Sequence, residues 1–210
     1  MTAPTHSSPA MAGEGDHPKG GGGVTSPAPA SPARGWRPGD PRPNIPSMLR
    51  VDQAGEYGAT RIYAGQLAVL GSRHPAARVI ARMAAQEDRH LAHFDALLAA
   101  RGVRPTLLQP FWSVAGHALG AVTALMGPNA AMACTAAVET EIDKHYSEQL
   151  QALGADEPEL AATIEEFQAE ELEHRDTALA AGAENALGYP MLSAVIRAGC
   201  RAAIALSKRI

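Results

Sequence analysis

After residue 46, apolar residues recur every three to four positions along the chain, and this spacing is typical of amphipathic helices. Glycine and proline breaks divide the pattern into six predicted helices. Five of them cover about 47–71, 75–101, 110–126, 157–181 and 187–208. The remaining helix, the fourth in chain order, follows the break at 127–129 and ends at about 153. The first, second, fourth and fifth helices, each about 25 residues long, are long enough to span a four-helix bundle.

The residues at the ends of these stretches support the boundaries. Ser47 and Asp156 are the expected N-caps of the first and fifth helices. Gly71, Gly102 and Gly154 follow the ends of the first, second and fourth helices, where glycine commonly ends a helix.

Composition divides the chain into two parts. Residues 1–46 are rich in glycine, proline, serine and alanine and bury too little apolar area to fold, so we predict a disordered leader. Residues 47–210 then form one domain. Abundant alanine and only 4% aromatic residues favour an all-α fold for it.

Charge and cysteine usage restrict the setting. The net charge is −4 and the basic residues are dispersed, which argues against a nucleic-acid partner. Cys134 and Cys200 lie in apolar helical stretches and are expected to be buried thiols of a reducing compartment. The leader resembles neither a secretory signal nor an organellar transit peptide, so a cytosolic setting is favoured.

An E-x-x-H motif occurs in the second and fifth helices, and each is preceded by a helix with one more glutamate. Glu87 lies 31 residues after Glu56, and Glu171 lies 32 residues after Glu139. Two antiparallel helix pairs would therefore present the same constellation. The set is Glu56, Glu87, His90, Glu139, Glu171 and His174. A third match in the glycine-rich leader is attributed to chance.

These carboxylates lie on the apolar stripes of their helices, where a bare charge is costly. Two divalent metal ions would neutralise four glutamates, and oxygen with imidazole ligands suits iron or manganese. The competing interpretation, solvated glutamates and core histidines, explains each motif alone but not the duplication. In the last motif Glu170 and Glu173 are alternatives, and the i, i+3 spacing with the apolar stripe favours Glu171.

Four further residues are candidates for contacts with these ligands. Asp52 and Asp143 lie one turn from Glu56 and Glu139, so either could orient a ligand histidine. Tyr63 and Tyr146 could hydrogen-bond to a ligand or relay electrons. Each of the four could equally be structural.

Several long blocks resemble the di-iron demethoxyubiquinone hydroxylases of ubiquinone biosynthesis. They are RVDQAGEYGATRIYAGQLAVL (50–70), QEDRHLAHF (86–94), RPTLLQPFWSVAGHALGAVTALMG (104–127), AMACTAAVETEIDKHY (131–146), EELEHRD (170–176) and IRAGCRAAIALSKRI (196–210). The resemblance implies a ferritin-like four-helix bundle with two additional membrane-interface helices. The family's iron ligands fall on the six residues chosen above, and its substrate-side pair falls on His145 and Tyr146.

The resemblance also implies a monooxygenase that uses O₂ and a reductant to hydroxylate the ring of a polyprenyl demethoxyubiquinol. The alternative is a ferritin- or rubrerythrin-like ferroxidase, and a third is a non-enzymatic helical scaffold. A lipid-binding partner protein is suggested by the family, and a homo-oligomer is compatible with it. The sequence does not fix the isoprenoid tail length, the oligomeric state or the native electron donor, which is NADH or the quinol itself.

The two additional helices suggest how a lipid-soluble substrate arrives. Residues 111–138 contain no Asp, Glu, Lys or Arg, and we expect an interfacial or buried helix there and not a membrane span. The last helix combines apolar residues with Arg197, Arg201, Lys208 and Arg209, as a helix lying on anionic lipid does, although an ordinary amphipathic capping helix has the same pattern.

We therefore expect a peripheral protein on the cytoplasmic face of a bacterial inner membrane, or on the matrix side of the mitochondrial inner membrane in a eukaryote. Phe111, Trp112, Leu119 and Met126 are expected to line the opening for the substrate.

Overall fold

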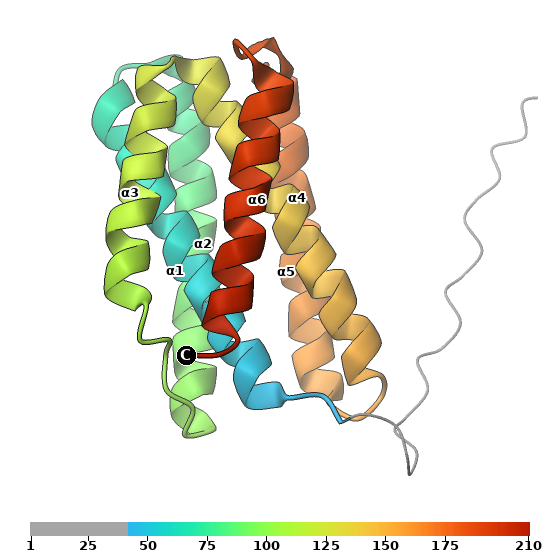
Figure 1. Ribbon diagram of the computed structural model, residues 1–210. Coiled ribbons are helices and arrows are strands. Elements are labelled where there is room, and N and C mark those ends of the chain that lie inside the picture. Colours follow the sequence, from blue (N-terminus) through green and yellow to red (C-terminus); the bar gives the residue numbers. More distant parts are fainter. Residues whose placement is uncertain (1–41) are drawn as a thin grey trace, which may run out of the picture. The chain divides into compact units, whose positions relative to one another are not determined.

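Six α-helices and one short 3₁₀ helix make up residues 42–210, the part of the chain that the computed structural model describes (Figure 1). They are α1 (Ile45–Leu70), α2 (Pro75–Ala100), α3 (Gln109–Leu125), α4 (Pro128–Leu153), α5 (Pro158–Ala180), η1 (Ala183–Asn185) and α6 (Tyr189–Ser207). No strand occurs among these residues, which confirms the all-α prediction. Residues 1–41 of the leader predicted for 1–46 lie outside the described part of the chain.

Both predicted N-caps are wrong. Asn44 caps α1, because its side-chain oxygen accepts a hydrogen bond of 3.1 Å from the backbone N–H of Ser47, which lies within the first turn. Glu157 occupies the N-cap position of α5 without a capping hydrogen bond, because Pro158 is the first helical residue and the residue before a proline is disfavoured in the helical conformation. The helix η1 was not predicted, and it begins after Gly182, whose φ is +94°.

The helices pair in chain order. α1 packs on α2 and α4 packs on α5, and these two pairs form the bundle (Figure 1). α3 lies along α1 and α6 lies along α4, so the two additional helices cover the same side of the bundle. This arrangement is the ferritin-like bundle with two extra helices that was expected.

Two of the three apolar clusters in the described residues lie inside the bundle on either side of the candidate ligands, and the third packs α6 against α1 and α4. On α1, Leu49 belongs to one cluster and Tyr63 to the other, and Glu56 lies midway between them. On α2, Ile80 and Phe94 flank the E-x-x-H motif in the same way. Because all four helices follow this order, their polar side chains meet at one level in the middle of the bundle.

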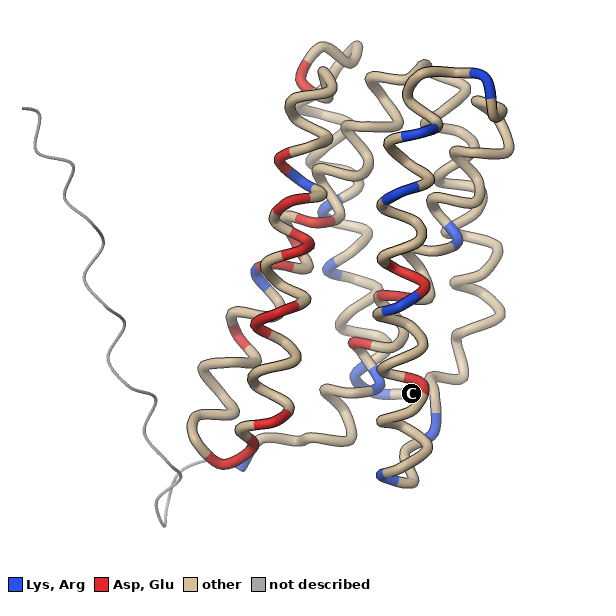
Figure 2. Tube along the Cα trace, turned by 180° about the vertical axis from the view of Figure 1, so that it is seen from behind, with Lys and Arg blue, Asp and Glu red and all other residues tan. Residues whose placement is uncertain are grey.

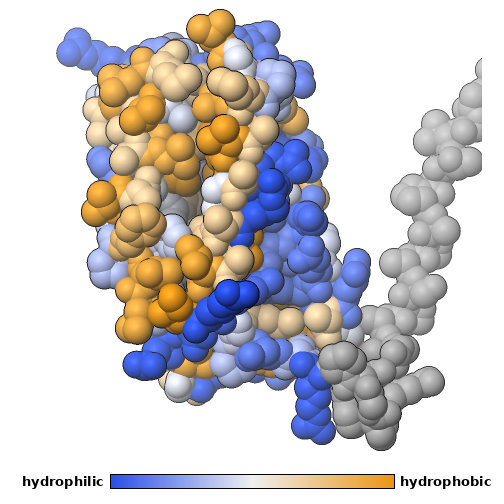
Figure 3. Space-filling model, in the orientation of Figure 1, coloured by the Kyte–Doolittle hydropathy of each residue, from blue (hydrophilic) through white to orange (hydrophobic). Residues whose placement is uncertain are grey.

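The outer faces of α3 and α6 expose many large apolar side chains, so much of this face is orange or tan in Figure 3. They are Phe111, Val114, Val122, Leu125 and Met126 on or next to α3, and Leu187, Met191, Val195 and Leu206 on or next to α6. Among the described residues, α6 alone is long and apolar enough to cross a membrane, and 11% of that stretch is buried. Seen from the opposite side, acidic residues are concentrated along α5 (Figure 2).

Two of the arginines expected to face lipid have a partner in the bundle. Arg197 and Arg201 of α6 contact one carboxylate oxygen of the buried Glu141 on α4, at 2.6 Å and 2.9 Å. These contacts join α6 to the bundle, although both arginine side chains remain 41% and 51% exposed.

Candidate metal centre

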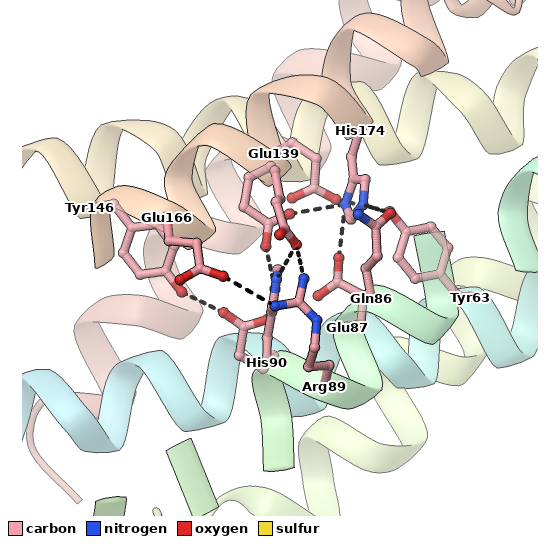
Figure 4. A network of polar contacts seen from close by, with 12 residues as sticks. Tyr63, Gln86, Glu87, Arg89, His90, Glu139, Tyr146, Glu166 and His174 are labelled. Atoms are coloured by element: carbon pink, nitrogen blue, oxygen red, sulfur yellow. Dashed lines mark hydrogen bonds and ion pairs between the residues drawn. The ribbon is translucent and has the colours of Figure 1, made fainter. Parts of the chain in front are cut away.

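Four helices bring the six predicted ligands together in the interior of the bundle (Figure 4). All six are at most 3% exposed. They form two groups whose ligand atoms lie within 4.8 Å of one another. The first group is Glu56, Glu87, His90 and Glu171, and the second is Glu87, Glu139, Glu171 and His174. Glu87 and Glu171 belong to both groups, which is the arrangement that bridging carboxylates need.

Both histidines direct Nδ1 toward these carboxylates. His90 Nδ1 lies 3.0 Å from Glu171 Oε1 and 3.4 Å from Glu56 Oε2. His174 Nδ1 lies 3.0 Å from Glu87 Oε1 and 3.1 Å from Glu171 Oε2. Each histidine therefore presents one nitrogen to the middle of the cluster.

Several of the converging atoms lack a hydrogen bond, although they are buried. They are His90 Nδ1, Glu87 Oε1 and Glu171 Oε1. Buried polar atoms without partners are rare, and atoms that share a metal ion are a standard explanation. Four carboxylates and two imidazoles also match the ligand chemistry of two iron or manganese ions. The residues fit a two-metal centre.

The charges of the cluster are balanced against one another. Burial, followed by repulsion from Glu171 and Glu56, raises the pKa of Glu87 well above its usual value. Burial also raises the pKa of Glu171, but the facing imidazoles of His174 and His90 outweigh it and lower that pKa to about 2. Burial lowers the pKa of His90, and the facing carboxylates Glu171 and Glu56 outweigh it and raise the pKa to about 10. Protons therefore neutralise a cluster that two divalent ions could neutralise instead.

Two tyrosines hold the carboxylates that belong to only one group each. The Tyr63 hydroxyl donates a hydrogen bond of 3.1 Å to Glu139, and the Tyr146 hydroxyl donates one to Glu56. Burial raises the pKa of both hydroxyls well above the usual value, so both remain donors. The expected tyrosine contacts with ligands are confirmed.

Neither aspartate contacts a ligand histidine, so the structural alternative holds for both. Asp52 lies 3.3 Å from His145 Nε2 and accepts a hydrogen bond of 2.6 Å from Gln149. Asp143 accepts a hydrogen bond of 2.7 Å from Gln168. Both aspartates face a neighbouring helix and not a ligand histidine. Their spacing of one helical turn from a glutamate carries no information about this direction.

The outer nitrogens of the ligand histidines have partners that the sequence interpretation missed. His90 Nε2 donates to Glu170 at 2.8 Å, and His174 Nε2 donates to Gln86 at 3.0 Å. The signal was available, because Gln86 and Glu170 each precede the glutamate of an E-x-x-H motif.

A cavity of about 360 Å³ opens beside the cluster and is lined almost entirely by apolar side chains of α1, α3, α4 and α6. Its polar lining consists chiefly of Asp52, Glu56, His145 and Tyr146. Trp112 and Leu119 line it as expected, whereas Phe111 and Met126 are outside it and exposed. The cavity therefore reaches one candidate ligand, Glu56, and the tyrosine that holds it.

Two repeated helix pairs that bring four glutamates and two histidines together are the arrangement of ferritin-like proteins, in which such a cluster could hold metal ions. Comparison with known sequences identifies the family. The family model described as "Ubiquinone biosynthesis protein COQ7" matches residues 43–207, and the chain belongs to this family.

Curated relatives agree with this assignment. The chain is 58% identical over 175 residues to a 3-demethoxyubiquinol 3-hydroxylase from Rhodospirillum rubrum, covering 82% of each sequence. It is 52% identical over 172 residues to the mitochondrial NADPH-dependent 3-demethoxyubiquinone 3-hydroxylase of Mus musculus, covering 80% of this chain and 79% of that protein. It is 43% identical over 179 residues to the mitochondrial 5-demethoxyubiquinone hydroxylase of Saccharomyces cerevisiae, covering 78% and 77%.

Proposed function

We propose that this protein is a 3-demethoxyubiquinol 3-hydroxylase, a di-iron monooxygenase of ubiquinone biosynthesis. The observation that carries the proposal is the apolar cavity that ends at Glu56 and Tyr146 of the two-metal cluster. Such a cavity suits an aromatic ring with an apolar tail. In the reaction one atom of O₂ replaces the hydrogen of a ring C–H as a hydroxyl group. The other atom leaves as water, for which a reductant supplies two electrons and the solvent supplies two protons.

The two irons would be held by the six clustered residues, and iron would supply the activation of O₂. Glu56 and His90 belong to one position and Glu139 and His174 to the other, with Glu87 and Glu171 common to both. The surrounding apolar clusters exclude bulk water from these ligands, which keeps the oxidation directed at the bound substrate.

His145 and Tyr146 are the side chains proposed to act beside the substrate. The Gln149 amide donates to His145 Nε2 at 3.0 Å and to Asp52 at 2.6 Å, so the imidazole faces the cavity in a fixed orientation. We assign to His145 the exchange of a proton with a hydroxyl group of the quinol. Tyr146 fixes Glu56 through its hydrogen bond, which keeps that carboxylate at the edge of the cavity.

The exposed apolar faces of α3 and α6 support entry of the substrate from a membrane. Both helices line the cavity on their inner faces and expose large apolar residues on their outer faces (Figure 3). A peripheral protein would bury these outer faces in the membrane interface. The proposed location is the cytoplasmic face of a bacterial inner membrane or the matrix side of the mitochondrial one. A lipid-binding partner protein and a second copy of the chain are the proposed protein partners.

The test is a single-turnover assay with the iron-loaded protein, a short-chain demethoxyquinol, a reductant and labelled O₂. We expect a ring product that carries one labelled oxygen atom. Glu171→Gln should abolish product formation, whereas Glu173→Gln, an exposed residue on the same helix, should leave it unchanged. Oxidation of added Fe(II) without any quinone product would instead favour the ferroxidase. Binding of fewer than two irons per chain would refute both activities.

A further inference from the structure

The ligand histidines are connected across the bundle by side chains that are not ligands. His90 on α2 donates through Nε2 to Glu170 on α5, and His174 on α5 donates through Nε2 to Gln86 on α2. Each partner immediately precedes a glutamate shared by the two metal positions, and Gln86 and Glu170 lie 84 residues apart, as the two histidines do. The two connections are therefore equivalent positions of the repeat.

The two connections differ in charge. Glu170 offers a carboxylate, which Arg89 contacts from the outside while Arg89 also lies 3.4 Å from Glu166. Gln86 offers a neutral amide oxygen. An imidazole N–H that donates to a carboxylate makes the opposite ring nitrogen a stronger ligand than one that donates to an amide. The hydrogen bonds from Tyr63 and Tyr146 do not make the two metal positions differ in charge, because each is donated by a tyrosine hydroxyl to a glutamate.

We infer that Glu170 and Gln86 are positioning residues that make the two metal positions unequal. The position formed with Glu56 and His90 binds its metal more tightly than the position formed with Glu139 and His174. The inference rests on the proposed two-metal centre. It also states which metal position faces the cavity, because Glu56 is the ligand that lines the cavity. The more electron-rich metal would thus lie on the substrate side.

Four proteins test this inference: the wild type, Glu170→Gln, Gln86→Glu and the double variant Gln86→Glu/Glu170→Gln. Anaerobic titration of the metal-free proteins with Fe(II) or Mn(II) gives the two dissociation constants. Loss of such a histidine partner typically costs 10–100-fold in metal affinity. We expect unequal constants in the wild type and in the double variant, and convergence within about 3-fold in each single variant. Mössbauer spectra of the di-iron forms should likewise show two distinct iron sites in the wild type and in the double variant. Each single variant should show a single kind of site.

Glu166→Gln is the matched control. It removes the other carboxylate that contacts Arg89 and leaves both histidine connections in place, so the two constants should stay unequal. Thermal melting of each metal-free variant separates a folding defect from a change in affinity.

Equal constants in the wild type, or a difference that persists in both single variants, would overturn the inference and leave the two-metal centre standing. A role that is only structural would lower the melting temperature of the single variants and keep the ratio of the constants. A wild type that binds fewer than two ions would overturn the metal centre itself, and the inference with it.

Discussion

The contact between α3 and α1 makes a quantitative prediction for Gly120→Ala. Gly120 of α3 lies directly against the backbone of α1, where an added Cβ would be 1.9 Å from the carbonyl oxygen of Ile62 and 2.8 Å from its carbon. Gly65 of α1 makes the reciprocal approach, with its Cβ position 2.2 Å from the carbonyl oxygen of His117. Because these are main-chain atoms, no side-chain rotation can relieve the overlap. The two helices must separate by about 1 Å.

The magnitude follows from two opposing effects. Overpacking in a well-packed interface costs about 3 kcal/mol at the upper end of its usual range. Replacing a helical glycine by alanine returns about 1 kcal/mol of helix propensity. The net loss is about 2 kcal/mol, which lowers the melting temperature of a domain of this size by about 4–8 °C. Since α3 forms one wall of the cavity, we also expect a higher KM for the quinol.

Thermal unfolding followed by circular dichroism measures the effect. Gly199→Ala is the control on α6, because an added Cβ there meets nothing within 4 Å, and this variant should melt at the wild-type temperature or slightly above it. If Gly120→Ala melts within about 1 °C of the wild type, α3 does not pack against α1 at this distance.

Three further predictions concern the metal, α6 and a buried thiol. The metal-free protein should lose stability as the pH rises from about 5.5 to 8, because burial raises the folded-state pKa of Glu87 and Glu139 and unfolding then releases protons. Melting curves should show this trend, and added Mn(II) should weaken it because the metal replaces the protons. Glu141→Gln should lower the melting temperature by about 2–4 °C, since each contact of α6 with half-exposed arginines is worth about 1 kcal/mol or less, and metal content should not change. Cys134 should resist alkylation at pH 8 in the folded protein and react after unfolding, because burial raises its pKa to about 12.

The bundle was predictable from the sequence because its helices have clear ends and one apolar face each. The prediction failed where two signals competed at a boundary. Asp156 is a good capping residue by type, but Pro158 places the cap at Glu157. Asn44 precedes the apolar pattern, so it was assigned to the leader and not to the cap of α1.

The location of the candidate centre was predictable because the helix pairs are repeated, and the repeat identified which glutamates meet. The structure brings all six of these residues together. The contacts around them were not predictable in the same way, because they join different helices. Glu170 was weighed only against Glu171 as a neighbour of His174 within one helix, whereas its actual partner is His90 on another helix. Spacing along one helix carries no information about such a contact.

The symmetry of the repeat builds the centre, and departures from it distinguish its two sides. Near the cavity, Asp52, His145 and Gln149 form a buried hydrogen-bonded group. The residues 83 positions away in the other repeat are Thr135, Ile62 and Gln66, which lack both the carboxylate and the imidazole. The ligands themselves repeat without change, so a duplicated site alone would have no preferred face. His145, the cavity and the glutamate beside His90 all belong to the half of the centre that contains Glu56, which gives the reaction one side from which a substrate can approach.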